Sequence, residues 1–127
     1  MLRGELGAGK TCLVQGLALG LGITEPITSP TFALAHHYRG QYRGQRGAAP
    51  TALVHLDLYR LEQAAAADEL FAQEEEEARA LGALLAVEWP ERLSFLPEPS
   101  WLVVLESCGE GRLARIQFLD SAEIPSR

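Results

Sequence analysis

Residues 4–11 read Gly-Glu-Leu-Gly-Ala-Gly-Lys-Thr and match the pattern G-x-x-x-x-G-K-[ST], the phosphate-binding loop called Walker A. Its glycines let the chain turn tightly enough for backbone N–H groups to wrap a polyphosphate. Lys10 supplies a positive charge for the β- and γ-phosphates, and the Thr11 hydroxyl faces the Mg²⁺ that accompanies them. The helix that follows would direct its positive end at the anion. A glycine-rich turn that merely leads into an ordinary helix is the alternative.

A nucleotide hydrolase also needs a carboxylate for its metal and a group that positions the attacking water. Ligands of open α/β sheets bind at the carboxyl ends of strands, so acids at predicted strand ends are the candidates. Glu88 follows the apolar run of residues 83–87, which is where a Walker B acid would stand. The alternative is a strand-end carboxylate held by solvent or by Arg92.

Asp57 is a second candidate acid. His55, Asp57 and Tyr59 alternate with leucines, so the three polar side chains share one face of a predicted strand. Polar groups on an otherwise apolar strand are costly unless they meet partners, which favours a site. A solvated sheet face is the alternative.

Other polar residues are weaker candidates. Thr31 follows a proline turn and could reach the γ-phosphate as a switch-type residue. His36 and His37 are neighbours on a predicted strand, so they point to opposite faces and cannot bind one metal together. The four glutamates at 74–77 are expected to form a solvated helical stretch.

A helix is expected directly after the phosphate-binding loop. Its apolar residues recur at spacings of three and four along one stripe: Leu13, Val14, Leu17, Ala18 and Leu21. Gly20 and Gly22 mark its end. Cys12, inside this helix, is expected to be a small buried residue. Residues 1–3 leave room for only a very short strand ahead of the loop.

Elsewhere the pattern predicts several strands and one helical stretch. Strands are expected over residues 31–39, 51–59, 83–87, 101–106 and 112–118, the last two paired as a hairpin. Residues 64–80 favour one helix or two short ones. Residues 39–47, polar and basic, form a loop or hairpin tip. Helices mixed with strands predict a single α/β domain over residues 1–119 and a frayed tail over 120–127.

Composition narrows the function further. The chain has 127 residues, of which 47% are hydrophobic and 22% charged, as in an ordinary globular domain. No apolar run suits a membrane span and no signal peptide pattern is present, so a cytoplasmic protein without a membrane partner is expected. Its two cysteines have no metal-ligand spacing. A net charge of −6 disfavours autonomous nucleic-acid binding, although the basic loop leaves a local RNA contact open.

Four motifs occur in order: GELGAGKT at 4–11, SPTF at 29–32, HLDLYRL at 55–61 and VEWPER at 87–92. Together they resemble the TsaE (YjeE) family of bacterial P-loop ATPases over residues 1–118. The resemblance implies a P-loop NTPase-like mixed sheet with flanking helices, here without the N-terminal segment that usually precedes the P-loop. It also implies a role in tRNA threonylcarbamoyladenosine biosynthesis. In that family the ATPase acts with the TsaD–TsaB heterodimer and meets tRNA only through the complex.

The resemblance also assigns roles to individual residues. The residues implied to contact ATP are Gly7, Ala8, Gly9, Lys10, Thr11 and Cys12. Thr11 and Glu88 are implied to be the Mg²⁺ ligands, and Lys10 to hold the phosphates. Asp57 matches an acid needed for hydrolysis, and Thr31 a switch-like residue near the γ-phosphate. Trp89 matches a tryptophan beside the metal acid.

Two other functions fit the same motifs. The chain could be a nucleotide-dependent docking module in which ATP orders a surface and hydrolysis is incidental. It could also be a small-molecule kinase, which would need arginines closing over the phosphates; the only arginine cluster lies in the loop at 39–47. A GTPase is disfavoured because no N-K-x-D guanine-reading motif is present.

Overall fold

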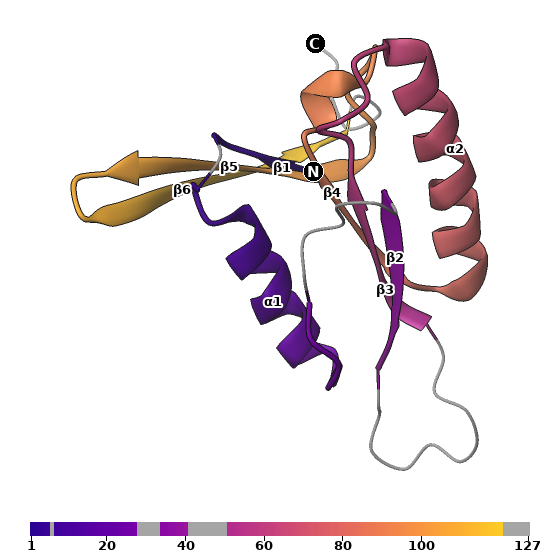
Figure 1. The fold of residues 1–127 in the computed structure, drawn as a ribbon, viewed down its shortest axis with the longest axis horizontal. Coiled ribbons are helices and arrows are strands. Elements are labelled where there is room, and N and C mark those ends of the chain that lie inside the picture. Colours follow the sequence, from indigo (N-terminus) through magenta and orange to yellow (C-terminus); the bar gives the residue numbers. More distant parts are fainter. Residues whose placement is uncertain (6, 28–33, 41–50, 121–127) are drawn as a thin grey trace, which may run out of the picture.

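The computed structural model describes residues 1–5, 7–27, 34–40 and 51–120. Six strands and two helices make up the regular structure of this part of the chain (Figure 1). In chain order the elements are β1 (Leu2–Arg3), α1 (Lys10–Gly20), β2 (Ala35–Arg39), β3 (Thr51–Asp57), α2 (Ala64–Leu81), β4 (Leu84–Glu88), the 3₁₀ turn η1 (Pro90–Arg92), β5 (Ser100–Cys108) and β6 (Gly111–Leu119).

All six strands form one mixed sheet in the order β2-β3-β4-β1-β5-β6. The four central strands are parallel, and β2 and β6 add to the two edges as antiparallel strands. Parallel neighbours bring their carboxyl ends to one edge of the sheet. The first residues of the phosphate-binding loop, the end of β3 and the end of β4 therefore meet at that edge.

Each of the two helices packs against the sheet through its own cluster of buried residues. Val14 and Ala18 of α1 pack with Leu53 and Ala86 of the sheet. Phe71 of α2 belongs to the other cluster, whose buried members also include Leu56, Leu58, Ala67, Val87 and Leu93. Leu53 and Leu56 of β3 thus belong to different clusters, because residues an odd number of positions apart face opposite sides of a strand. Figure 1 shows α1 and α2 on opposite sides of the sheet.

The predicted mixed α/β fold is confirmed. Residues 64–80 form one helix, which extends to Leu81, and β5 and β6 pair as the expected hairpin. The strand predicted over 31–39 is described from Ala35 onward, and the one predicted over 51–59 ends at Asp57. Of the loop predicted over 39–47, Arg39 belongs to β2, and residues 41–47 lie outside the described residues, as does the predicted tail beyond residue 120. Neither described helix combines the length and the apolar composition needed to cross a membrane.

One expectation about burial is wrong, and two leucines are more exposed than their type indicates. Cys12 is exposed, because the buried positions of α1 are Lys10, Val14 and Ala18, and residue 12 faces away from that line. Leu17 is 36% exposed, so the apolar stripe of α1 is narrower than its sequence indicates. Leu84 is 43% exposed, so β4 is covered on both faces only toward its carboxyl end.

The Asp68 carboxylate ties α2 to the segment that follows η1. It accepts hydrogen bonds from the Ser94 backbone N–H at 3.0 Å and from the Ser94 hydroxyl at 2.6 Å. These bonds lower the pKa of Asp68 from its usual 3.8. A carboxyl with a lowered pKa in the folded state adds stability above its unfolded pKa and loses it as the pH falls through the folded value.

Asp68→Asn is accordingly expected to lower the urea midpoint of unfolding at pH 7. The gap between the two proteins should close as the pH falls below about 4. Urea titrations of both proteins between pH 7 and pH 3 provide the measurement. A gap of constant size over that range would show that the charge of Asp68 is not responsible.

Candidate functional site

The phosphate-binding loop joins β1 to α1 through two glycines in the left-handed region. Gly7 has φ 82° and Gly9 has φ 107°. L-residues with a Cβ rarely adopt these angles, so glycine is required at both positions. Helix α1 then begins at Lys10, with the Leu13 N–H donating to the Gly9 carbonyl at 2.9 Å. The free N–H groups of the first turn of α1 consequently point toward the carboxyl edge of the sheet.

Lys10 lies inside this loop and is only 5% exposed. Its ammonium donates a hydrogen bond to the Gly4 carbonyl and lies 3.8 Å from the centroid of the Trp89 ring. Burial lowers the pKa of Lys10 from its usual 10.5, and the nearby carboxylates of Glu88, Glu91 and Asp57 act in the opposite direction. The carbonyl and the aromatic face hold the cation at the mouth of the loop.

Trp89 follows β4 directly and has φ 61°, the one positive φ at a non-glycine residue among those described. Such a backbone conformation costs of order 1–3 kcal/mol and persists only where neighbouring contacts stabilise it. Here the indole packs against Tyr59 with ring centroids 4.9 Å apart, and the Arg92 guanidinium lies 5.8 Å from its centroid. The left-handed turn places the indole under the Lys10 ammonium.

Glu88, at the end of β4, is 3% exposed and meets two side chains. The Thr11 hydroxyl, at the start of α1, lies 3.4 Å from Glu88 Oε2. His55 Nε2, from β3, lies 2.5 Å from the same oxygen. Arg92, the partner considered from the sequence, stacks over Tyr59 and Trp89 instead. Glu88 is therefore a buried carboxylate that faces the first turn of α1.

Asp57 lies beside Glu88 at the carboxyl ends of two neighbouring parallel strands. The two residues are register partners in the β3–β4 ladder. Asp57 is 8% exposed, and its Oδ1 accepts a hydrogen bond from the Tyr59 N–H at 3.0 Å. A residue that bonds the backbone two positions ahead forms an Asx-type turn, which orients the carboxylate as the strand ends.

His55 was not identified as a site residue from the sequence. It is fully buried, and its Nδ1 has no hydrogen-bond partner among the described residues. The sequence does contain a signal that could have identified it. His55 lies two residues before Asp57 on the same strand face, and buried polar groups need partners. Which partner it meets depends on the pairing of β3 with β4, and this pairing is a tertiary property.

A cleft of about 550 Å³ with both polar and apolar walls opens beside the phosphate-binding loop. Its walls come from the phosphate-binding loop, from the segment after β4 and from the end of β5, and include Gly4, Ala8, Trp89, Glu91 and Ser107. This volume lies within the range of about 300–1,000 Å³ that is typical of small-molecule sites. A larger cleft of about 660 Å³ is mostly apolar, and no residue of the phosphate-binding loop contributes to it. The cleft that includes Gly4 and Ala8 of the phosphate-binding loop is therefore the candidate nucleotide site.

The structure brings Lys10, Thr11, Asp57 and Glu88 to one edge of the sheet. Gly7, Ala8 and Gly9 lie in the loop beside them, whereas Cys12 points to solvent one residue farther into α1. Thr31 lies outside the described residues. The oxygen donors of Thr11, Asp57 and Glu88 are of the type that Mg²⁺ prefers, so the site suits a magnesium-bound phosphate chemically.

Comparison with known proteins gives one consistent result. A family model described as "Threonylcarbamoyl adenosine biosynthesis protein TsaE" matches residues 1–114. A protein of Nostoc sp. named tRNA threonylcarbamoyladenosine biosynthesis protein TsaE is 43% identical over 111 residues, which are 87% of this chain and 64% of that protein. Proteins of the same name from Synechocystis sp. and Treponema pallidum are 50% identical over 99 residues and 41% identical over 112 residues.

The matches cover 76% of this chain and 57% of the Synechocystis protein, and 87% of this chain and 74% of the Treponema protein. This chain thus spans about six-tenths of the length of the Nostoc and Synechocystis relatives. A family match over residues 1–114, on a mixed sheet with a phosphate-binding loop, shows that the chain belongs to the TsaE family.

Proposed function

We propose that this chain is the ATP-binding and ATP-hydrolysing component of the machinery that makes threonylcarbamoyladenosine in tRNA. The convergence of Thr11 and Glu88 at the mouth of the phosphate-binding loop carries the proposal. A hydroxyl from the first turn of α1 and a carboxylate from the neighbouring strand are the two groups that a P-loop ATPase uses to hold its magnesium. The names of the relatives supply the pathway.

Each residue then has a role that follows from its position. The loop N–H groups and the amino end of α1 bind the phosphates. The Lys10 ammonium leaves the Gly4 carbonyl and the Trp89 face to bind the β- and γ-phosphates, since a phosphate is the stronger partner. Thr11 and Glu88 would hold Mg²⁺, which neutralises charge developing on the phosphates when bound. Asp57, beside Glu88, orients the attacking water.

His55 acts as a positioning residue in this scheme. It holds one oxygen of Glu88 and so fixes the orientation of the carboxylate toward Thr11. Residues that orient a metal ligand in this way commonly affect metal affinity or activity by about 10–100-fold. The chain thus presents a preorganised oxygen donor at the place where the metal is expected.

The proposal includes dependence on partners. TsaD and TsaB, as a heterodimer, are the partners that the family resemblance implies, and tRNA is met through that complex. We expect slow turnover of magnesium-ATP by the chain alone and at least a tenfold increase when the heterodimer is added. Steady-state phosphate release at saturating magnesium-ATP, with and without the heterodimer, measures this. Fast turnover that the heterodimer leaves unchanged would contradict the partner-dependent scheme.

A further inference from the structure

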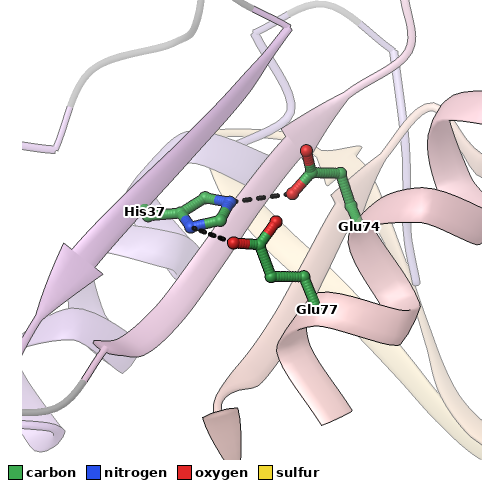
Figure 2. A group of neighbouring side chains, drawn as sticks. All are labelled: His37, Glu74 and Glu77. Atoms are coloured by element: carbon green, nitrogen blue, oxygen red, sulfur yellow. Dashed lines mark hydrogen bonds and ion pairs between the residues drawn. The ribbon is translucent and has the colours of Figure 1, made fainter. Parts of the chain in front are cut away.

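A second group of potential ligands lies on the α2 side of the sheet, away from the phosphate-binding loop. His37 projects from β2, and Glu74 and Glu77 project from α2 toward it (Figure 2). His37 Nε2 lies 2.8 Å from Glu74 Oε2, and His37 Nδ1 lies 4.0 Å from Glu77 Oε1. One donor atom from each residue lies within 4.8 Å of the others. Residues distant in sequence thus place one nitrogen and two oxygen donors together.

The position of Glu74 is unusual for a carboxylate. Ala67, Phe71 and Ala78 are the buried residues of α2, and Glu74 falls on the same stripe at spacings of three and four. Its side chain is only 13% exposed, so the expectation of a fully solvated run at 74–77 is wrong for this residue. A carboxylate on the sheet-facing stripe of a helix is costly unless a cation or donor accompanies it.

The negative charges of Glu74 and Glu77 favour a bound cation. Glu74 and Glu77 lie within a run of four glutamates, and Arg79 pairs with Glu75, at 3.6 Å, rather than with either of them. Among the described side chains, His37 is the basic group that contacts both carboxylates. An imidazole supplies a full positive charge only when it is protonated. A divalent cation supplies more charge and uses the nitrogen lone pair of the neutral ring.

The donors lie close enough to reach one ion after a side-chain rotation, since one ligand atom from each residue lies within 4.8 Å of the others. Zinc binds nitrogen and oxygen at about 2.0–2.2 Å, which puts tetrahedral ligands roughly 3.3–3.6 Å apart. Glu74 faces Nε2 of His37 and Glu77 faces Nδ1, and one ion binds only one ring nitrogen, so Glu77 must turn to the Nε2 side to share an ion with Glu74. Glu77, whose side chain is 53% exposed, has room to rotate toward the shared position. One histidine with carboxylates favours a first-row transition metal over Ca²⁺ or Mg²⁺, which take oxygen donors.

We propose that His37, Glu74 and Glu77 form a binding site for a divalent transition-metal cation, with Zn²⁺ as the best fit. Water would complete the tetrahedral shell. A bound ion would link the edge strand β2 to α2 and so stabilise the strand that flanks β3. This site is separate from the candidate nucleotide cleft, because none of its three residues lines that cleft. His36, the neighbour of His37, points to the other face and contacts Tyr38 at 3.0 Å.

The test is a titration of the folded chain with Zn²⁺, and separately with Co²⁺, in the absence of nucleotide. All proteins carry Cys12→Ser and Cys108→Ser, because exposed thiols bind the same metals. The parent should bind one ion by calorimetry, and Co²⁺ should give the visible absorption of a tetrahedral complex. His37→Gln and Glu77→Gln should each weaken binding at least about tenfold. His36→Gln, on the opposite face of the same strand, is the matched control and should bind as the parent does.

Thermal unfolding provides a second readout. Zn²⁺ should raise the unfolding temperature of the parent and of His36→Gln but not that of His37→Gln. Glu77→Gln changes an exposed side chain and keeps the test valid if His37→Gln folds poorly. Equal affinity in the parent and in both ligand variants would overturn the proposal. Failure of the parent to bind either metal would also overturn it and would leave the cluster as a histidine–carboxylate ion pair.

Discussion

Glu88→Gln is expected to slow ATP hydrolysis at least about a hundredfold and to leave ATP binding largely intact. Removal of the charge at this position takes a ligand from the proposed magnesium. A metal ion stabilises such a transition state by several kcal/mol, and about 1.4 kcal/mol corresponds to a tenfold change in rate. Glutamine keeps the shape of the side chain, so the contacts to Thr11 and His55 persist in neutral form. Phosphate release and nucleotide affinity, measured on the same protein, separate the two effects.

Glu69→Gln is the matched control, because it neutralises an exposed glutamate on α2 and should hydrolyse ATP at the parent rate. The same variants distinguish a protein whose ATP hydrolysis drives the modification cycle from a nucleotide-dependent docking module. If hydrolysis drives the cycle, Glu88→Gln should stop modification of tRNA after about one turnover of the reconstituted complex. Modification that continues at the normal rate through many cycles would show that ATP serves only to order a docking surface.

His55→Leu is expected to destabilise the folded chain by about 3–5 kcal/mol. His55 is fully buried and Glu88 is 3% exposed, so the substitution leaves a carboxylate inside the protein without its imidazole partner. Breaking a buried pair from one side costs about this much, whereas replacing both members with apolar residues is often close to neutral. Urea unfolding of the nucleotide-free chain measures the change.

The double variant His55→Leu/Glu88→Leu makes this prediction specific. It should lie within about 1 kcal/mol of the parent, although each single variant is much less stable. Such a recovery can come only from coupling between the two side chains. If the losses of the two single variants simply add in the double variant, His55 and Glu88 act independently and the positioning role of His55 fails.

Local patterns predicted most of the fold. The strand predicted over 51–59, the helix predicted over 64–80 and the hairpin predicted over 101–118 correspond to β3, α2 and the β5–β6 pair, with β3 ending two residues early at Asp57. These signals depend on contacts between near neighbours, which a single sequence displays directly. Burial was predicted less well. Cys12, Leu17 and Leu84 are more exposed than their hydrophobicity indicates, because coverage by other elements decides exposure.

The sequence predicted the chemistry of the site, but only some of the residues that form it. The motifs single out Lys10, Thr11, Asp57 and Glu88 because phosphate binding requires glycines, a lysine, a hydroxyl and acids at strand ends. Their roles remain predictions, and the geometry supports them through the contact between Thr11 and Glu88. Thr31 lies outside the described residues.

By itself, the sequence determined the donor types and the local elements that carry them, since periodicity, glycine placement and side-chain chemistry are all local. Only the tertiary structure decided which donors meet. The pairing of β3 with β4 brings His55 to Glu88, the left-handed turn at Trp89 brings the indole to Lys10, and the packing of α2 on the sheet brings Glu74 to His37. These contacts join residues 33, 79 and 37 positions apart, respectively, and no local pattern specifies a contact over such a separation.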